Sequence, residues 1–77
     1  METQNAIKKL AKAGFEVKQT GNRYFAQAGR NIISFFEQSG SVICINVRSS
    51  NDQDDAQSDY SAGVFCDNLT QAIRLAR

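Results

Sequence analysis

The sequence predicts an α+β domain, in which a curved antiparallel sheet of four or five strands carries one N-terminal and one C-terminal helix on the same face. Helical periodicity of apolar residues occurs at the two ends of the chain. Between them, apolar segments are separated by short turns that contain glycine. The 77 residues include no proline, repeat or linker, so residues 1–77 are expected to form a single domain.

The first expected element is a helix that Thr3 caps and that extends to about Ala13. Gly14 follows, in the position where a left-handed backbone commonly ends a helix. The apolar side of this helix is formed by Ala6, Ile7, Leu10, Ala11 and Ala13. The opposite side is basic and carries Lys8, Lys9 and Lys12. This pattern is typical of an amphipathic helix.

Four strands are expected next, and the connections between them are short. Their expected ranges are 15–19, 23–28, 32–38 and 42–48. Turns of two or three residues join consecutive strands only in antiparallel order, so the sequence predicts a meander.

Alternation sets the direction of the side chains along these strands. It places Tyr24 and Phe25 on opposite faces of the second strand, and Ile33 and Phe35 together on one face of the third. The other face of the third strand receives Ile32, Ser34 and Phe36.

The fourth strand reads VICINV and is apolar on both faces except at Asn46, which favours a central place in the sheet. We expect three of its side chains to face the helices, namely Ile43, Ile45 and Val47. Val42 and Cys44 are expected on the opposite face. The returning chain or a second subunit could cover that face, so a homodimer is one expectation.

The chain ends with a long loop over 49–58, a short strand over 63–66 and a second helix. Either Asp67 or Asn68 caps this helix, which extends to about Ala76. Its buried face is expected to contain Leu69, Ala72, Ile73 and Ala76, with Leu75 beside them.

Charge is distributed unevenly along the chain. Residues 1–48 contain seven basic and three acidic side chains, and residues 49–77 contain two basic and five acidic ones, although the total is only +1. Such a dipolar molecule favours oriented association with a charged partner or with itself.

The composition argues against an enzyme. Histidine is absent, which removes the commonest general base and metal ligand. Cys44 and Cys66 lie among apolar residues and are expected to be buried free thiols. We therefore expect no catalytic residue, no metal site and no cofactor.

An acidic segment places Asp52, Asp54, Asp55 and Asp59 within nine residues. It does not match a calcium loop of the EF-hand type, because Gln57 occupies the sixth position and Gly63 the twelfth, where such loops have glycine and glutamate. The segment is either a solvated loop or a contact surface for a basic partner. The neighbouring Tyr60 and Phe65 either anchor such a partner or pin the end of the loop onto the core.

A second candidate surface is basic. Five side chains could hold a nucleic-acid backbone, with Tyr24 and Phe25 among them to stack bases: Lys8, Lys9, Lys12, Arg23 and Arg30. The isoelectric point of about 7.8 is below the usual range of nucleic-acid-binding domains.

The chain resembles a known group of proteins in several motifs. The motifs are Asp59-Tyr60, Gly63, Phe65, Asn68-Leu69 and Ala72-Ile73, preceded by GSVICINVR, and the opening TQNAIKKLAKAGFEVKQTGNRYFA. They are similar to small accessory domains of phages and conjugative plasmids, which also occur inside large polyvalent proteins. The resemblance implies a mobile-element protein, and stand-alone members of such a set are often anti-CRISPR or anti-restriction inhibitors of host defence.

The leading expectation is therefore a non-enzymatic inhibitor in the cytoplasm of a bacterial host. It would bind a host protein or ribonucleoprotein defence complex through Asp52, Asp54, Asp55, Asp59 and Tyr60. A nucleic-acid-binding domain and a structural or oligomerisation module are the alternatives. No apolar run approaches the length of a membrane span, and the N-terminus lacks the apolar block of a secretory signal, so no membrane partner is expected.

Overall fold

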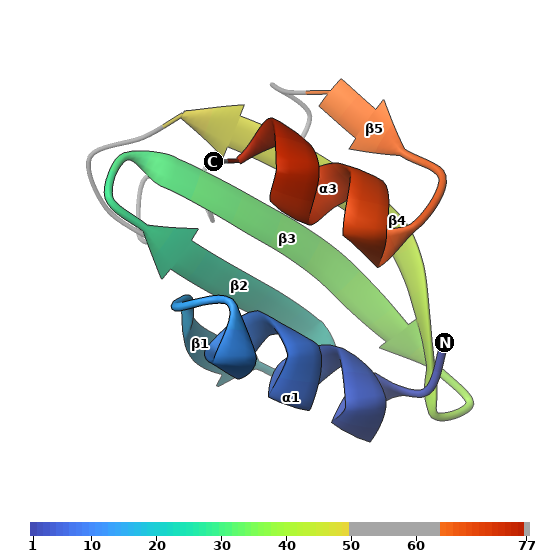
Figure 1. Cartoon of the computed structure of the whole chain (residues 1–77). Helices are drawn as coiled ribbons and strands as arrows, with labels where there is room; N and C mark the ends of the chain where they lie inside the picture. The colour runs from blue at the N-terminus through green and yellow to red at the C-terminus, as the bar shows by residue number, and fades with distance from the viewer. Residues whose placement is uncertain (50–63, 77) are drawn as a thin grey trace.

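The computed structural model describes residues 1–49 and 64–76. Within these ranges an N-terminal helix, five strands and a C-terminal helix form an α+β fold, which confirms the expected class (Figure 1). The elements are α1 (Thr3–Lys12), β1 (Glu16–Thr20), β2 (Arg23–Ala28), β3 (Asn31–Gln38), β4 (Ser41–Ser49), β5 (Val64–Cys66) and α3 (Leu69–Leu75). The predicted boundaries differ from these by no more than one residue.

The strands form one open antiparallel sheet in the order β1-β2-β3-β4-β5, so the predicted meander is confirmed. The β3–β4 turn shows why the connections are short. Ser39 and Gly40 both have positive φ angles, 53° and 79°. Two consecutive positive φ values give the turn that matches the right-handed twist of neighbouring strands.

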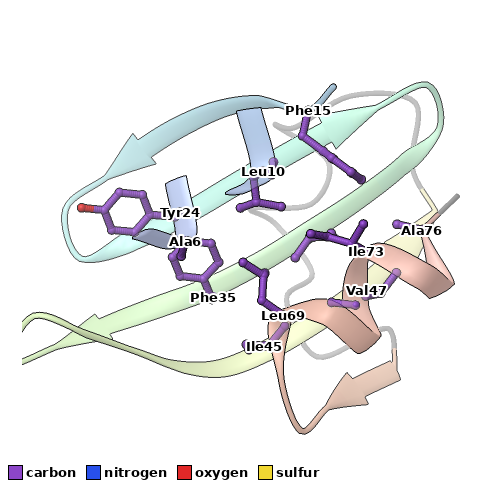
Figure 2. Packing of buried hydrophobic residues seen from close by; sticks show 13 residues of the cluster. Ala6, Leu10, Phe15, Tyr24, Phe35, Ile45, Val47, Leu69, Ile73 and Ala76 are labelled. Atoms are coloured by element: carbon purple, nitrogen blue, oxygen red, sulfur yellow. The ribbon is translucent and has the colours of Figure 1, made fainter. Parts of the chain in front are cut away.

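The main core lies between the sheet and the two helices, which cover the same face (Figure 1). Tyr24 and Phe35 stack within it, with ring centroids 5.1 Å apart and ring planes 8° from parallel (Figure 2). Ile33 is fully buried beside Phe35, as the alternation of β3 predicts. The expected buried face of α3 is also confirmed, because Leu69, Ala72, Ile73 and Ala76 all belong to this core.

The predicted facing of β4 is wrong at its first half. The β3–β4 register shifts between the pairs Ser34↔Asn46 and Phe36↔Ile43, and Cys44 lies at this bulge with a φ of 54°. The extra residue reverses the alternation that precedes it. Val42 therefore packs against the main core, whereas Ile43, paired with Phe36, lies on the opposite face.

The rest of β4 follows the prediction. Ile45 and Val47 are buried in the main core. A bulge changes the alternation on only one side of itself, so the half of the strand next to Asn46 keeps the expected direction.

The start of α1 also differs from the prediction. Glu2 is the N-cap and its side chain makes no capping bond, while Thr3 is the first helical residue. The backbone N–H and the hydroxyl of Thr3 both donate to the carbonyl oxygen of Gly40, at 2.9 and 3.1 Å. These bonds fasten the beginning of α1 to the β3–β4 turn. Ala11, expected on the apolar side, is exposed.

The start of α3 resolves the choice between two capping residues in favour of Asn68. Its side-chain oxygen accepts a hydrogen bond from the backbone N–H of Gln71 at 2.8 Å. The side chain of Gln71 in turn accepts one from the backbone N–H of Asp67 at 3.0 Å. The first bond satisfies a backbone donor that would otherwise lack a partner at the helix start, and the second holds the residue before the N-cap.

Candidate functional site

The acidic candidate site falls outside the residues that the structure describes, which applies to Asp52, Asp54, Asp55, Asp59 and Tyr60. The strands that flank it are described. β4 ends at Ser49, β5 begins at Val64, and Val47 pairs with Val64 in the antiparallel ladder. The acidic segment is thus attached at both ends to neighbouring strands, at one end of the sheet.

Phe65, the aromatic residue next to this segment, lies on β5 opposite Asn46. Its side chain is 59% exposed and belongs to neither core cluster. Phe65 therefore lies outside the two described core clusters, and more than half of its surface is exposed.

The five residues of the predicted basic surface do not lie together. Lys8, Lys9 and Lys12 are on α1, which covers one face of the sheet. Arg30 is exposed in the turn between β2 and β3. Arg23 lies at the other end of β2, and its side chain is on the sheet face that the helices leave uncovered.

The surroundings of Arg23 explain this separation. Its guanidinium carbon is 5.1 Å from the ring centroid of Phe25 and 5.3 Å from that of Phe36. Both rings point away from the helices, because Tyr24 and Phe35, their neighbours in sequence, point toward them. Cation–π attraction and packing of the aliphatic stem hold Arg23 there.

The same sheet face contains a buried polar pair. Ser34 and Asn46 are direct register partners, and they are 1% and 0% exposed. Among the described residues, the Ser34 hydroxyl and the Asn46 amide have no hydrogen-bond partner. Buried polar groups without partners lower stability, so they are unusual in a native domain.

The structure brings together three cations that the sequence does not connect. Lys9 and Lys12 from α1 and Arg74 from α3 line two adjoining hollows of about 240 and 280 Å³ between the helices. Both hollows share Lys9 and Ile73. We call this surface the helix-layer groove, and it is lined by Lys9, Lys12, Ala13, Thr70, Ile73 and Arg74.

A side-chain hydrogen bond joins the two helices across this groove. The ammonium group of Lys9 donates to the hydroxyl of Thr70, across a sequence separation of 61 residues. Ile73, which lines both hollows, belongs to the main core (Figure 2). Sequence analysis missed Arg74 because nothing in a local pattern shows that the last turn of α3 lies near α1.

The electrostatic character of the helix layer is uniformly basic. Neither α1 nor α3 contains an aspartate or glutamate. Lys9 and Lys12 are in the last turn of α1, and Arg74 is in the last turn of α3. Cations at these positions also stabilise the partial negative charge of each helix C-terminus.

Cys44 and Cys66 are not paired in a disulfide, and the prediction that both are buried is wrong. Cys44 is exposed at the bulge, and Cys66 is half-buried. Burial raises the pKa of the Cys66 thiol, and the adjacent carboxylate of Asp67 raises it further. A raised pKa lowers the fraction of reactive thiolate.

Residues 1–49 and 64–76 contain neither a candidate metal site nor a candidate membrane-spanning helix. No group of three histidine, cysteine, aspartate or glutamate side chains is placed to hold a metal ion. No helix in the described ranges is long and apolar enough to cross a bilayer.

Comparison of the chain with protein-family models, curated proteins and solved structures finds no match. The resemblance to phage and plasmid accessory domains therefore stays a prediction.

Proposed function

We propose that this chain is a non-enzymatic phage or mobile-element protein that binds and inhibits a host defence nucleoprotein complex in the bacterial cytoplasm. The observation that carries the proposal is the concentration of four of the eight acidic residues in the nine residues from Asn51 to Asp59. Carboxylates can bind, through charge-assisted hydrogen bonds, to the arginine and lysine side chains with which a nucleoprotein complex otherwise holds phosphates.

The described part of the chain supports this proposal in two ways. Val47 and Val64 tie the strands on either side of the acidic segment together, which shortens the span that the segment has to close. Phe65 presents an exposed aromatic ring next to it. Aromatic side chains are common anchors at the centre of a protein interface, and charged groups are common around its rim.

The test compares two variants of equal charge. The first variant changes the acidic segment to Asn at Asp52, Asp54, Asp55 and Asp59. The second changes the four remaining acids, as Glu2→Gln, Glu16→Gln, Glu37→Gln and Asp67→Asn. Both variants have a formal net charge four units more positive, so they differ only in where the carboxylates are removed.

The assay is an affinity pull-down from nuclease-treated bacterial lysate at moderate salt, followed by plaque counts of a phage on a strain that carries the captured defence system. We expect the native chain and the second variant to capture one ribonucleoprotein complex and to restore plaques. The first variant should do neither, while its stability stays within about 1 kcal/mol of the native value, since exposed charges contribute little. Undiminished capture by the first variant would refute the proposal.

A second candidate function is nucleic-acid binding by the helix layer. The observation that favours it is the set Lys8, Lys9, Lys12 and Arg74 on two helices without acidic residues. Phosphate contacts predict an affinity that falls steeply as salt rises. A gel shift of single- and double-stranded oligonucleotides at low and moderate salt tests this, and the absence of any shift at low salt would exclude it.

A further inference from the structure

We infer that the helix-layer groove is a docking site for an acidic amphipathic peptide segment of a partner protein. The partner would place an apolar side chain on the floor of the groove and carboxylates against its rim. This inference goes beyond the proposed function, because it uses different residues of the chain. Its partner is acidic, whereas the partner in the proposed function is basic. Either one can fail without the other.

The floor of the groove supplies the apolar half of the argument. Ile73 lines both hollows and Ala13 lines one of them. The two hollows share Lys9 and Ile73, so they adjoin between the helices. A groove between helices with an apolar floor is the type of surface that binds a short amphipathic helix through a few anchors.

The rim supplies the charged half. Lys9, Lys12 and Arg74 contribute three cations, and the helices that carry them contain no carboxylate. Three cations around one depression repel one another, and an incoming carboxylate relieves this repulsion. A guanidinium and two ammonium groups bind carboxylates through charge-assisted hydrogen bonds.

A side-chain hydrogen bond also links the two walls of the groove before a partner binds. This bond runs from Lys9 to Thr70, and Ile73 is held in the main core. Preformed sites bind more tightly, because less side-chain ordering opposes association.

The apolar floor is what favours a peptide over a nucleic-acid backbone. Phosphate groups would use the rim cations but would leave uncovered the apolar lining of the hollows, to which Ala13 and the small exposed part of Ile73 contribute. An acidic amphipathic peptide uses the floor and the rim together. The two ligand classes therefore differ in whether affinity depends on apolar residues of the ligand.

The experiment uses fluorescence anisotropy with the whole chain and a fluorescein-labelled peptide of about twelve residues, in which leucine recurs every three or four positions among glutamates. The comparison ligands are an all-glutamate peptide and an oligothymidylate of the same length. The test variant is Lys12→Gln with Arg74→Gln. The matched control is Lys8→Gln with Lys18→Gln, which removes two exposed cations that do not line the groove.

We expect saturable binding of the amphipathic peptide, weaker binding of both comparison ligands, and an affinity about tenfold lower for the groove variant. The control variant should remain within about twofold of the native chain, because screening weakens distant charges. Amide NMR shifts on titration should concentrate at Ala13, Thr70 and Ile73. Circular dichroism checks that both variants fold.

Four outcomes of these binding experiments would overturn the inference. They are the absence of saturable binding, equal losses in the groove and control variants, equal or tighter binding of a comparison ligand, and NMR shifts elsewhere on the chain. A dimer that the groove variant abolishes would also overturn it, because the occupant would then be a second copy of the chain.

Discussion

At the bulge around Cys44 we expect glycine to be more stable than alanine, which is the reverse of the general rule for strands. Within a regular strand, glycine is less stable than alanine by about 0.5–1 kcal/mol, because it loses more conformational freedom on folding. Cys44 has a φ of 54°, and this left-handed backbone costs any residue with a Cβ atom about 1–2 kcal/mol of folding free energy. At position 44 the steric cost of a Cβ atom exceeds the entropic cost of glycine.

We therefore expect Cys44→Gly to be more stable than Cys44→Ala by about 0.5–1 kcal/mol, which corresponds to roughly 4 °C in Tm for a domain of this size. Comparing these two variants, rather than either one with the native chain, cancels the loss of the thiol. The measurement is equilibrium unfolding in urea, followed by circular dichroism and compared at equal m-values.

Position 43 provides the matched control, because Ile43 precedes Cys44 on the same strand and its φ is not positive. There Ile43→Ala should be more stable than Ile43→Gly by about 0.5–1 kcal/mol. If alanine were as stable as glycine at position 44, the bulge would not lie at Cys44. The assignment of Val42 to the core and Ile43 to the opposite face would then be wrong as well.

Three other predictions concern single side chains. Burial, and to a lesser degree the nearby carboxylate of Glu37, raises the pKa of Tyr24 in the folded state. The stability that this group contributes is therefore complete below about pH 10 and is lost as pH rises through the folded pKa. In urea unfolding at increasing pH, Tyr24→Phe should lose less free energy of unfolding above pH 10 than the native chain does. Iodoacetamide should modify Cys44 faster than Cys66 in timed mass spectra, because Cys44 is exposed and Cys66 has a raised pKa; equal rates would contradict this. Thr3→Val should lower the free energy of unfolding by about 1 kcal/mol by removing the hydroxyl bond to the turn between β3 and β4, and an unchanged value would show that this bond does not stabilise α1.

Much of the fold could be read from local patterns. The glycine turns separate strands whose alternation is clear, so the faces of Tyr24, Phe25, Ile33 and Phe35 were predicted correctly. Asn68 was one of the two capping residues that the sequence offered for α3. Such features depend on residues two to four positions apart, and local sequence contains that information.

The candidate site was predictable only in part. Lys9 and Lys12 stood out as a basic helix side, and the absence of acids from both helical segments is visible in the sequence. Their neighbour Arg74 did not stand out, because it is 62 residues from Lys12 and the packing of both helices on one sheet face brings them together. Arg23 was grouped with the lysines because a linear sequence does not show which sheet face a residue occupies.

The sequence by itself determined the α+β class, the meander order and the uneven distribution of charge, because each follows from residue types and short spacings. Only the tertiary structure decided which side of β4 faces the core. VICINV is apolar on both faces, so alternation alone could not detect the one-residue shift at Cys44. The tertiary structure also decided that three cations surround one groove, since contacts between distant helices depend on how both pack against the same sheet.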